Sequence, residues 1–341
     1  MPIYDHLQAL YGLPAYDFPG SDARTDDLPE PGSFAWRITS YPYQGGEDDG
    51  AWTHALYQGG EDDDADWTHA LAHFCATVDT TRVRALIAGA WHEPEDGGLE
   101  TDSSAVIEPL VAARDRFPAL KALFLGDMVL EQSEMSWINL TDVTPLLAAF
   151  PDLEEFGVRG GRGLRFPALR HTALRKLTME SAGLPAEVVR GVGASDLPAL
   201  EHLDLWLGDP HQGGDSQVTD LEAILSGVRL PRLRHLALRN SQMQDAVAAA
   251  VASAPVVARL KVLDLSMGVL TDEGAAALLA GRPLTHLEHL DLHHHYISEP
   301  LQNRLRHALE PAGVLLNLDR DDAYEMHNSD GRVWRYVAVG E

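Results

Sequence analysis

Residues 260–292 read LKVLDLSMGVLTDEGAAALLAGRPLTHLEHLDL, and the pattern L-x-x-L-x-L occurs twice in this stretch, 27 residues apart. In each copy the alternating leucines predict a short strand with one apolar face, because successive side chains of a strand point to opposite sides. The stretch between the copies predicts a helix, since Thr271 is a good N-cap, acidic residues follow it and apolar residues recur at helical spacing. The segment therefore predicts a unit of one strand and one helix.

The same pattern recurs along most of the chain when any aliphatic residue or Phe is accepted at its three positions. The central leucines at 203, 236, 263 and 290 are 33, 27 and 27 residues apart, which indicates a structural repeat. One unit alone exposes an apolar face, whereas stacked units bury these faces in one core and extend a parallel sheet. Copies begin at Val83 (degenerate), Leu120, Leu153, Leu174, Leu200, Leu233, Leu260 and Leu287, and a degenerate final strand spans 314–318.

The string LTDEGAAALLA after LKVLDLSMGVL resembles the ribonuclease-inhibitor type of leucine-rich repeat, and HLEHLDLHHHYISEPLQNRL fits the same frame. The resemblance covers about residues 80–320. It implies an α/β leucine-rich-repeat solenoid, a horseshoe with a parallel concave sheet, convex helices and terminal caps. One departure is that Gly208, Ser241, Gly268 and His295 stand where the family usually has Asn, so the turn backbone groups need other partners.

Over the whole chain, the sequence is similar to a family of small cytosolic leucine-rich-repeat proteins of actinobacteria that has no established activity. The segments that carry this resemblance are SWINLTDVTPLLAAFPDLE, LPALEHLDLWLG, LDLHHHYIS and WRYVAVGE. The resemblance implies a cytoplasmic bacterial solenoid and no particular reaction.

Three regions are expected along the chain. Residues 1–78 are predicted to form an N-terminal cap with a duplicated acidic loop, in which YQGGEDDGAWTHAL is followed by YQGGEDDDADWTHAL. Residues 79–320 are predicted to form the solenoid. Residues 321–341 are predicted to form a capping strand or hairpin, because Val333, Trp334, Tyr336 and Val337 have strong strand propensity.

The charge balance excludes several classes of partner. Fifty-two acidic and 26 basic residues give a formal net charge of −26, which disfavours nucleic acid and anionic membranes and leaves a basic protein as a suitable partner.

No apolar stretch is long enough to span a bilayer, and Met1–Leu10 lacks the features of a secretory signal. The single Cys75 excludes an internal disulfide framework and fits a reducing compartment, so we expect a cytoplasmic protein.

The concave wall is the first candidate site, because strand residues that flank the buried leucines are expected to face outward there. Trp206 is expected to be exposed and, with Arg239, to anchor a protein or peptide, as aromatic and Arg residues commonly do at interfaces. The alternative is a set of solvated positions with intramolecular pairs such as Asp204 with Arg239. The predicted partner-binding residues are Asp204, Trp206, Arg239, Asp264, Asp291 and His293.

Other chemistries have weaker support. The run His293–His295, with His286 and His289 nearby, suggests a metal site, but strand geometry spreads these side chains apart, and one His filling the Asn position is the simpler interpretation. The acidic runs 47–49 and 61–64 lack the ligand order of a calcium loop. Cys75 and His73 point apart on a helix, which favours a packed thiol over a nucleophile.

The sequence therefore favours a non-enzymatic protein- or peptide-binding scaffold that uses the concave face, without catalytic residues, cofactor or metal. The alternative is a metal-dependent enzyme, or an accessory of one, with its site at the His-rich C-terminal coils. Metal analysis of protein purified without a His tag discriminates between the two.

Overall fold

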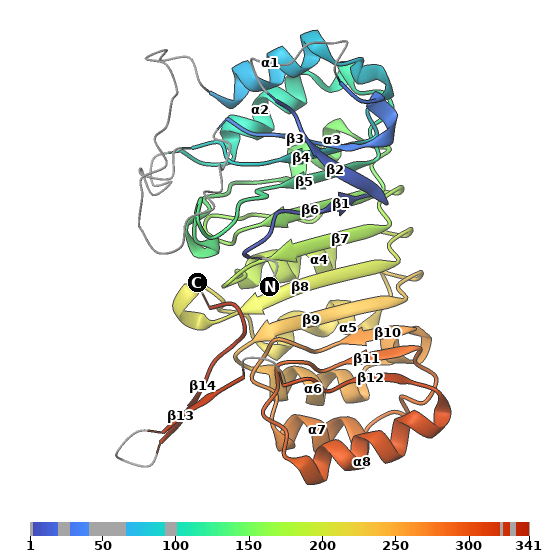
Figure 1. Ribbon diagram of the computed structural model, residues 1–341. Coiled ribbons are helices and arrows are strands. Elements are labelled where there is room, and N and C mark those ends of the chain that lie inside the picture. The colour runs from blue at the N-terminus through green and yellow to red at the C-terminus, as the bar shows by residue number, and fades with distance from the viewer. Residues whose placement is uncertain are drawn as a thin grey trace.

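One long sheet organises the described part of the chain, which comprises residues 3–19, 28–40, 66–92, 101–320, 323–327 and 332–340. In this computed structural model, 12 strands of the described residues follow one another in chain order from β1 to β12 (Figure 1). The first pair is antiparallel and every later pair is parallel. The strands are β1 (Ala9–Leu10), β2 (Leu13–Asp17), β3 (Ala35–Ile38), β4 (Ala85–Ala88), β5 (Ala122–Leu125), β6 (Glu155–Arg159), β7 (Lys176–Glu180), β8 (His202–Gly208), β9 (His235–Ser241), β10 (Val262–Asp264), β11 (His289–Asp291) and β12 (Leu315–Asn317).

The strand register confirms the repeat spacing. Leu203 pairs with Leu236, Leu236 with Leu263, and Leu263 with Leu290. All four are fully buried and belong to one hydrophobic cluster that runs through the molecule. Consecutive units therefore cover one another's apolar faces, as the sequence predicts. The result is an α/β fold that is compatible with a leucine-rich-repeat solenoid.

Helices return the chain between strands, and neighbouring helices contact one another along the same side of the sheet (Figure 1). The helix expected after Leu270 is present, and the hydroxyl of Thr271 caps it by accepting from the amide of Glu273. None of the described helices has the length and apolar character of a membrane span. The described helices are α1 (Trp67–Thr77), α2 (Ser104–Ala112), α3 (Thr144–Ala149), α4 (Ala186–Ala194), α5 (Glu222–Ser226), α6 (Gln244–Ser253), α7 (Asp272–Ala280) and α8 (Glu299–Leu309).

The sheet face opposite the helices, called the helix-free face below, is the one that the sequence predicts to be concave. Thr178, Asp204, Ala237, Asp264 and Asp291 lie on it, because they alternate with the leucines of the core. The N-terminal arm (Ile3–Tyr11) lies on this face over the first strands. Leu7, Leu10 and Tyr11 pack there in a cluster with Ala35, Ile87 and Phe124.

The regions outside the central repeats also contribute to the sheet. Strands β2 and β3, from the segment assigned to an N-terminal cap, continue the same parallel array into β4. The duplicated acidic segment lies outside the described residues up to Ala65.

Near the other end, β13 (Glu325–His327) and β14 (Val333–Arg335) form an antiparallel hairpin. The hairpin is a separate two-stranded sheet and does not pair with β12.

Candidate functional site

The helix-free face brings the six predicted residues together across β8 to β11. Arg239 of β9 pairs in register with Trp206 of β8. Its Nε and Nη2 donate to the Asp204 carboxylate at 3.0 and 2.6 Å, and its Nη1 lies 3.5 Å from Asp264. Its guanidinium carbon lies 5.0 Å from the centre of the Trp206 ring. The intramolecular pairing of Asp204 with Arg239, the alternative considered above, is therefore what the structure contains.

The expectation of an exposed Trp206 is wrong, since its side chain is 0% exposed. Trp206 belongs to a hydrophobic cluster with Met135, Met267 and Val339, against which Ile3 and Ala338 pack. Both ends of the chain thus cover the position where a partner's side chains were expected. The N and C termini lie close to each other near the carboxyl end of β8 (Figure 1).

Burial and charge act in opposite directions on the Arg239 cluster. Burial would lower the pKa of Arg239, but the Asp204 and Asp264 carboxylates outweigh burial and raise it, so the guanidinium stays charged. Burial raises the pKa of Asp264, and Arg239 offsets this only in part. The cluster is a desolvated arrangement in which the Arg239 cation needs both neighbouring acids.

The His run does not converge. The Nδ1 of His293 lies 2.8 Å from Asp291, and the hydrogen bond and charge of this carboxylate raise the pKa of His293. The Nε2 of His294 lies 3.0 Å from the Tyr336 carbonyl. His295 is fully buried; its Nδ1 accepts from the Ile297 amide and its Nε2 lies 3.2 Å from the Leu318 carbonyl, so it serves as a partner for backbone groups of the turn. Among the residues that the structure describes, no group of three or more His, Cys, Asp or Glu side chains is arranged to hold a metal ion.

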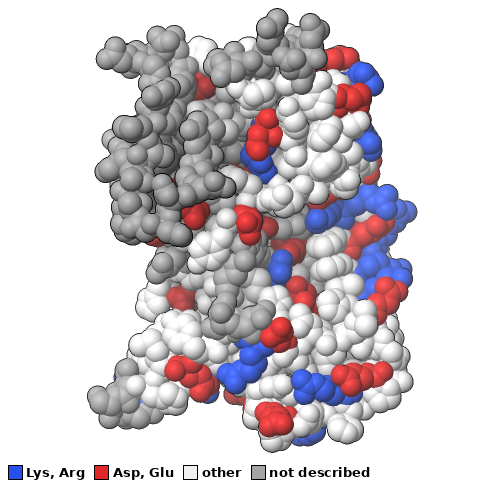
Figure 2. All heavy atoms as spheres, in the orientation of Figure 1, with Lys and Arg blue, Asp and Glu red and all other residues white. Residues whose placement is uncertain are grey.

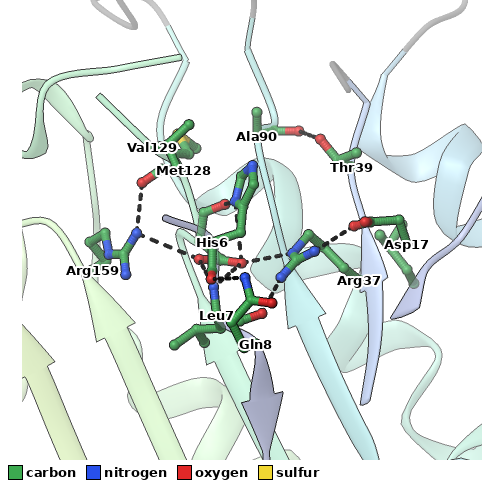
Figure 3. Close-up of polar contacts among 12 residues, drawn as sticks. His6, Leu7, Gln8, Asp17, Arg37, Thr39, Ala90, Met128, Val129 and Arg159 are labelled. Carbon is green, nitrogen blue, oxygen red and sulfur yellow. Dashed lines mark hydrogen bonds and ion pairs between the residues drawn. The ribbon is translucent and has the colours of Figure 1, made fainter. Parts of the chain in front are cut away.

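Asp127 anchors the N-terminal arm and was not singled out from the sequence. Its carboxylate is fully buried and accepts from the Leu7 amide at 3.1 Å and from the Arg37 Nε at 2.7 Å. The Arg159 Nη1 lies 3.5 Å from the same carboxylate, and the His6 ring contacts it at 3.4 Å. Figure 3 shows Arg37 and Arg159 reaching toward the arm from opposite sides of His6 and Leu7.

The charges around Asp127 keep it ionised. Burial alone would raise the pKa of this carboxyl group, but the hydrogen bond from His6 and the charges of Arg159 and Arg37 outweigh burial and lower it. Arg159 also donates its Nε to Glu180 at 2.8 Å. Burial raises the pKa of Glu180, and Arg159 counteracts the effect only in part. A line of alternating Arg and carboxylate side chains thus crosses the helix-free face beneath the arm.

A stacked pair of imidazoles occupies the amino ends of β8 and β9. The rings of His202 and His235 are 3.7 Å apart with an interplanar angle of 21°. The pKa of His202 is lowered to about 3, mainly by burial and secondly by the neighbouring His235. Burial likewise lowers the pKa of His235 to about 4, although Asp204 acts in the opposite direction. Both rings are therefore neutral near pH 7.

The C-terminal tail (Tyr336–Gly340) crosses the carboxyl ends of the strands. The Asn240 side-chain amide binds both backbone groups of Val339: Nδ2 donates to its carbonyl at 2.7 Å, and Oδ1 accepts from its amide at 2.9 Å. Its Nδ2 also donates to the Ser181 carbonyl at 3.3 Å. The Ala338 amide donates to the Met267 carbonyl at 2.8 Å. At the start of the tail, the Tyr296 hydroxyl donates to the Tyr336 carbonyl at 2.8 Å.

The hairpin before the tail carries a cluster of exposed apolar side chains. Nine large hydrophobic residues of the described chain are exposed, and five of them lie on or beside this hairpin. Figure 1 shows the hairpin projecting away from the sheet. The five are Tyr324, Met326, Val333, Trp334 and Tyr336.

Exposed charges form a different pattern, on the side of the molecule where the strands begin. The residue just before a strand often pairs with its counterpart on the next unit, as in Lys121 with Glu154, Arg175 with Glu201 and Lys261 with Glu288. Figure 2 shows basic and acidic residues side by side along this side. Opposite charges on neighbouring units therefore neutralise one another locally.

Among solved structures, that of a bacterial protein is similar over most of the chain. It is a crystal structure of a Bacteroides fragilis protein of unknown function, a target of the Northeast Structural Genomics Consortium. The TM-score is 0.66 and the sequence identity 27%, over 77% of this chain and 70% of that one. No protein-family model matches this chain, and no curated protein matches it. The likeness supports the α/β architecture with its long parallel sheet and assigns no activity.

Sequence reasoning missed the two docked chain ends. The signal for the tail was present, because Val337 and Val339 alternate with smaller or polar residues and are both buried. The signal for the arm was weaker. Asp127 is the second residue after the apolar strand β5, but nothing in its neighbourhood indicates that Leu7, 120 residues earlier, is its partner.

Proposed function

We propose that this chain is a non-enzymatic protein-binding scaffold, built as a cytoplasmic leucine-rich-repeat solenoid of the ribonuclease-inhibitor type, and that its C-terminal hairpin is the principal contact surface. The in-register leucine strands support the solenoid assignment. The exposed cluster on the hairpin is the observation that carries the binding function.

The apolar side chains of this hairpin are in an unfavourable environment when they are exposed to water. A two-stranded hairpin is at best marginally stable by itself in water. This one is attached through its base, where the Tyr336 amide donates to the Tyr296 hydroxyl and Arg335 lies over the Tyr296 ring. Its side chains nevertheless stay in solvent: Trp334 is 47% exposed and Tyr324 is 59% exposed. Clustered exposed aromatic residues mark interaction sites more often than isolated ones do.

The partner in this proposal is a basic polypeptide. The net charge of −26 attracts cationic proteins and disfavours self-association, because two copies repel each other. A basic partner is steered toward the acidic scaffold, and its apolar side chains then cover the hairpin.

The helix-free face contributes a second, polar surface in this proposal. The side chains of Arg239, Asp291 and His293 retain 20, 16 and 25% exposure there.

Two tryptophans with the same exposed fraction provide a matched test. Trp334 on the hairpin and Trp137, at the end of a short 3-10 helix far from it in sequence, are each 47% exposed. Full-length chains carrying Trp334→Ser or Trp137→Ser are used as baits in the native host, and co-purified proteins are quantified by mass spectrometry. We expect Trp334→Ser to reduce recovery of the main partner at least tenfold and Trp137→Ser to leave it unchanged.

Equal recovery with both variants would contradict the hairpin assignment. Sedimentation equilibrium at two protein concentrations tests the occupant: if the wild-type chain dimerises and Trp334→Ser abolishes the dimer, the partner is a second copy rather than a basic protein. Raising the salt concentration should slow association with a basic partner, because screening weakens charge steering.

A further inference from the structure

The C-terminal tail lies on a regular row of contact points. Asn240, Met267 and His294 are spaced 27 residues apart and occupy equivalent places at the ends of three consecutive strands. All three have left-handed backbone conformations, with φ of 53, 65 and 53°. Such angles are unfavourable for residues other than Gly, and in this structure they coincide with the groups that hold the tail.

Most of these contacts are made to main-chain groups of the tail. His294 contacts the carbonyl of Tyr336, Met267 accepts from the amide of Ala338, and Asn240 binds both backbone groups of Val339. Main-chain contacts of this kind tolerate changes in the bound sequence, as in other modes of extended-peptide recognition.

The side chain of Val339 adds a contact that depends on residue type. Val339 is 1% exposed and packs in the apolar cluster of Trp206, Met135 and Met267. The tail leaves one polar group of this cluster unsatisfied: the buried indole N–H of Trp206 has no hydrogen-bond partner among the described residues. A buried donor without an acceptor is destabilising, so a segment that brought an acceptor to this position would bind better than the tail does.

A hollow adjoins this row. It has a volume of about 380 Å³ and is lined by residues at the carboxyl ends of β8 and β9, among them Gly208, Ser241 and Gln242. Gln242 links it to the base of the tail, because its Nε2 donates to the Arg335 carbonyl at 3.4 Å. The hollow therefore lies beside the Asn240 end of the row, next to the base of the tail.

We propose that Asn240, Met267, His294 and the Val339 pocket form a docking groove for an extended polypeptide, and that the tail is an exchangeable ligand held in cis. The expected ligand is a strand of a partner protein with a Val-sized residue in the pocket and small neighbours. This groove is distinct from the hairpin surface and goes beyond the scaffold function proposed above.

The test uses the full chain and a fluorescent peptide of sequence RYVAVG, which corresponds to residues 335–340. Val339→Asp places a charge in an apolar pocket and should release the tail from the groove. Val228→Asp is the control, because Val228 is 80% exposed. Fluorescence anisotropy should show at least tenfold tighter peptide binding to Val339→Asp than to the wild-type chain or to Val228→Asp.

A second substitution locates the binding. Asn240→Gly removes the side-chain amide while keeping a residue that accepts a positive φ. Adding it to Val339→Asp should weaken peptide binding at least tenfold. Equal binding to the wild-type chain and Val339→Asp, or no effect of Asn240→Gly, would overturn the proposal.

Hydrogen exchange on the wild-type chain keeps the proposal testable if Val339→Asp does not fold. The amides of Ala338 and Val339 should exchange at least tenfold faster than the amide of Leu236 in the core, through local opening of the tail. Exchange of the tail amides only with global unfolding would show that the tail is not exchangeable. Trp334→Ser should leave peptide binding to Val339→Asp unchanged, so failure of the groove and failure of the hairpin surface are distinguishable.

Discussion

The two ends of the chain meet at the Trp206 cluster and are held by different forces. The N-terminal arm is fixed by ionised side chains, with the buried Asp127 between Arg37 and Arg159. The C-terminal tail is fixed by the neutral amide of Asn240, by main-chain groups and by the burial of Val339. The arm thus depends on charges that are far from water, whereas the tail does not.

This difference indicates which end of the chain another peptide can replace. Removing one member of a buried ion pair leaves the other charge desolvated, so the arm and its anchor behave as one unit. Each neutral hydrogen bond of the tail contributes only about 1 kcal/mol and can be replaced by water or by another peptide. We therefore interpret the arm as part of the fold and the tail as a resident ligand.

The largest expected effect tests the arm. Asp127→Ala leaves Arg37 and Arg159 without their shared carboxylate and should reduce the free energy of unfolding by about 3–5 kcal/mol. Urea denaturation followed by circular dichroism measures the change. Asp17→Ala is the control, because Asp17 also pairs with Arg37 but its side chain is 73% exposed, and its effect should stay below about 1 kcal/mol. Equal effects of the two variants would show that the arm is not anchored by buried charge.

The next effect concerns the apolar cluster beneath the tail. Trp206→Ala empties a fully buried site and should destabilise the chain by about 3–5 kcal/mol. Trp137→Ala, at a half-exposed position, should cost less than about 1 kcal/mol. Urea denaturation measures both. A Trp206→Ala chain as stable as the wild type would mean that the chain ends do not close over this residue in solution.

Trp206 also shows where inference from the sequence ends. The repeat spacing placed it on the helix-free face beside Arg239, and the structure agrees with that placement. Its burial depends on Ile3, Ala338 and Val339, which lie outside the repeats and more than 130 residues away in the chain. Local patterns such as the leucine register and the Thr271 cap were predictable because each involves neighbours or a fixed period. Contacts between non-repeating segments have no such period.

A smaller effect depends on pH and concerns β8 and β9 away from both anchors. The pKa values of His202 and His235 are lowered from 6.5 to about 3 and about 4, so the unfolded chain binds more protons than the folded one below about pH 6.5. Stability should therefore fall as the pH drops from 7 to 5, by at most about 2 kcal/mol for each imidazole. Urea denaturation of the wild-type chain and of His202→Gln/His235→Gln at both pH values isolates this contribution. An equal loss of stability in both chains would mean that the stacked pair does not titrate as described.

The smallest expected effect separates burial from charge. If Asp127 is important for stability because it is desolvated, an exposed ion pair should contribute little to stability. Lys261 and Glu288 form such a pair, with side chains 56 and 63% exposed. Lys261→Glu places like charges on neighbouring units and should reduce the free energy of unfolding by no more than about 1 kcal/mol, because solvent and salt screen them. Exchanging both residues, Lys261→Glu with Glu288→Lys, should restore it. The measurement is urea denaturation at low and high salt. A loss comparable to that of Asp127→Ala would show that the net charge of −26, rather than the burial of particular pairs, governs how the units and the chain ends hold together.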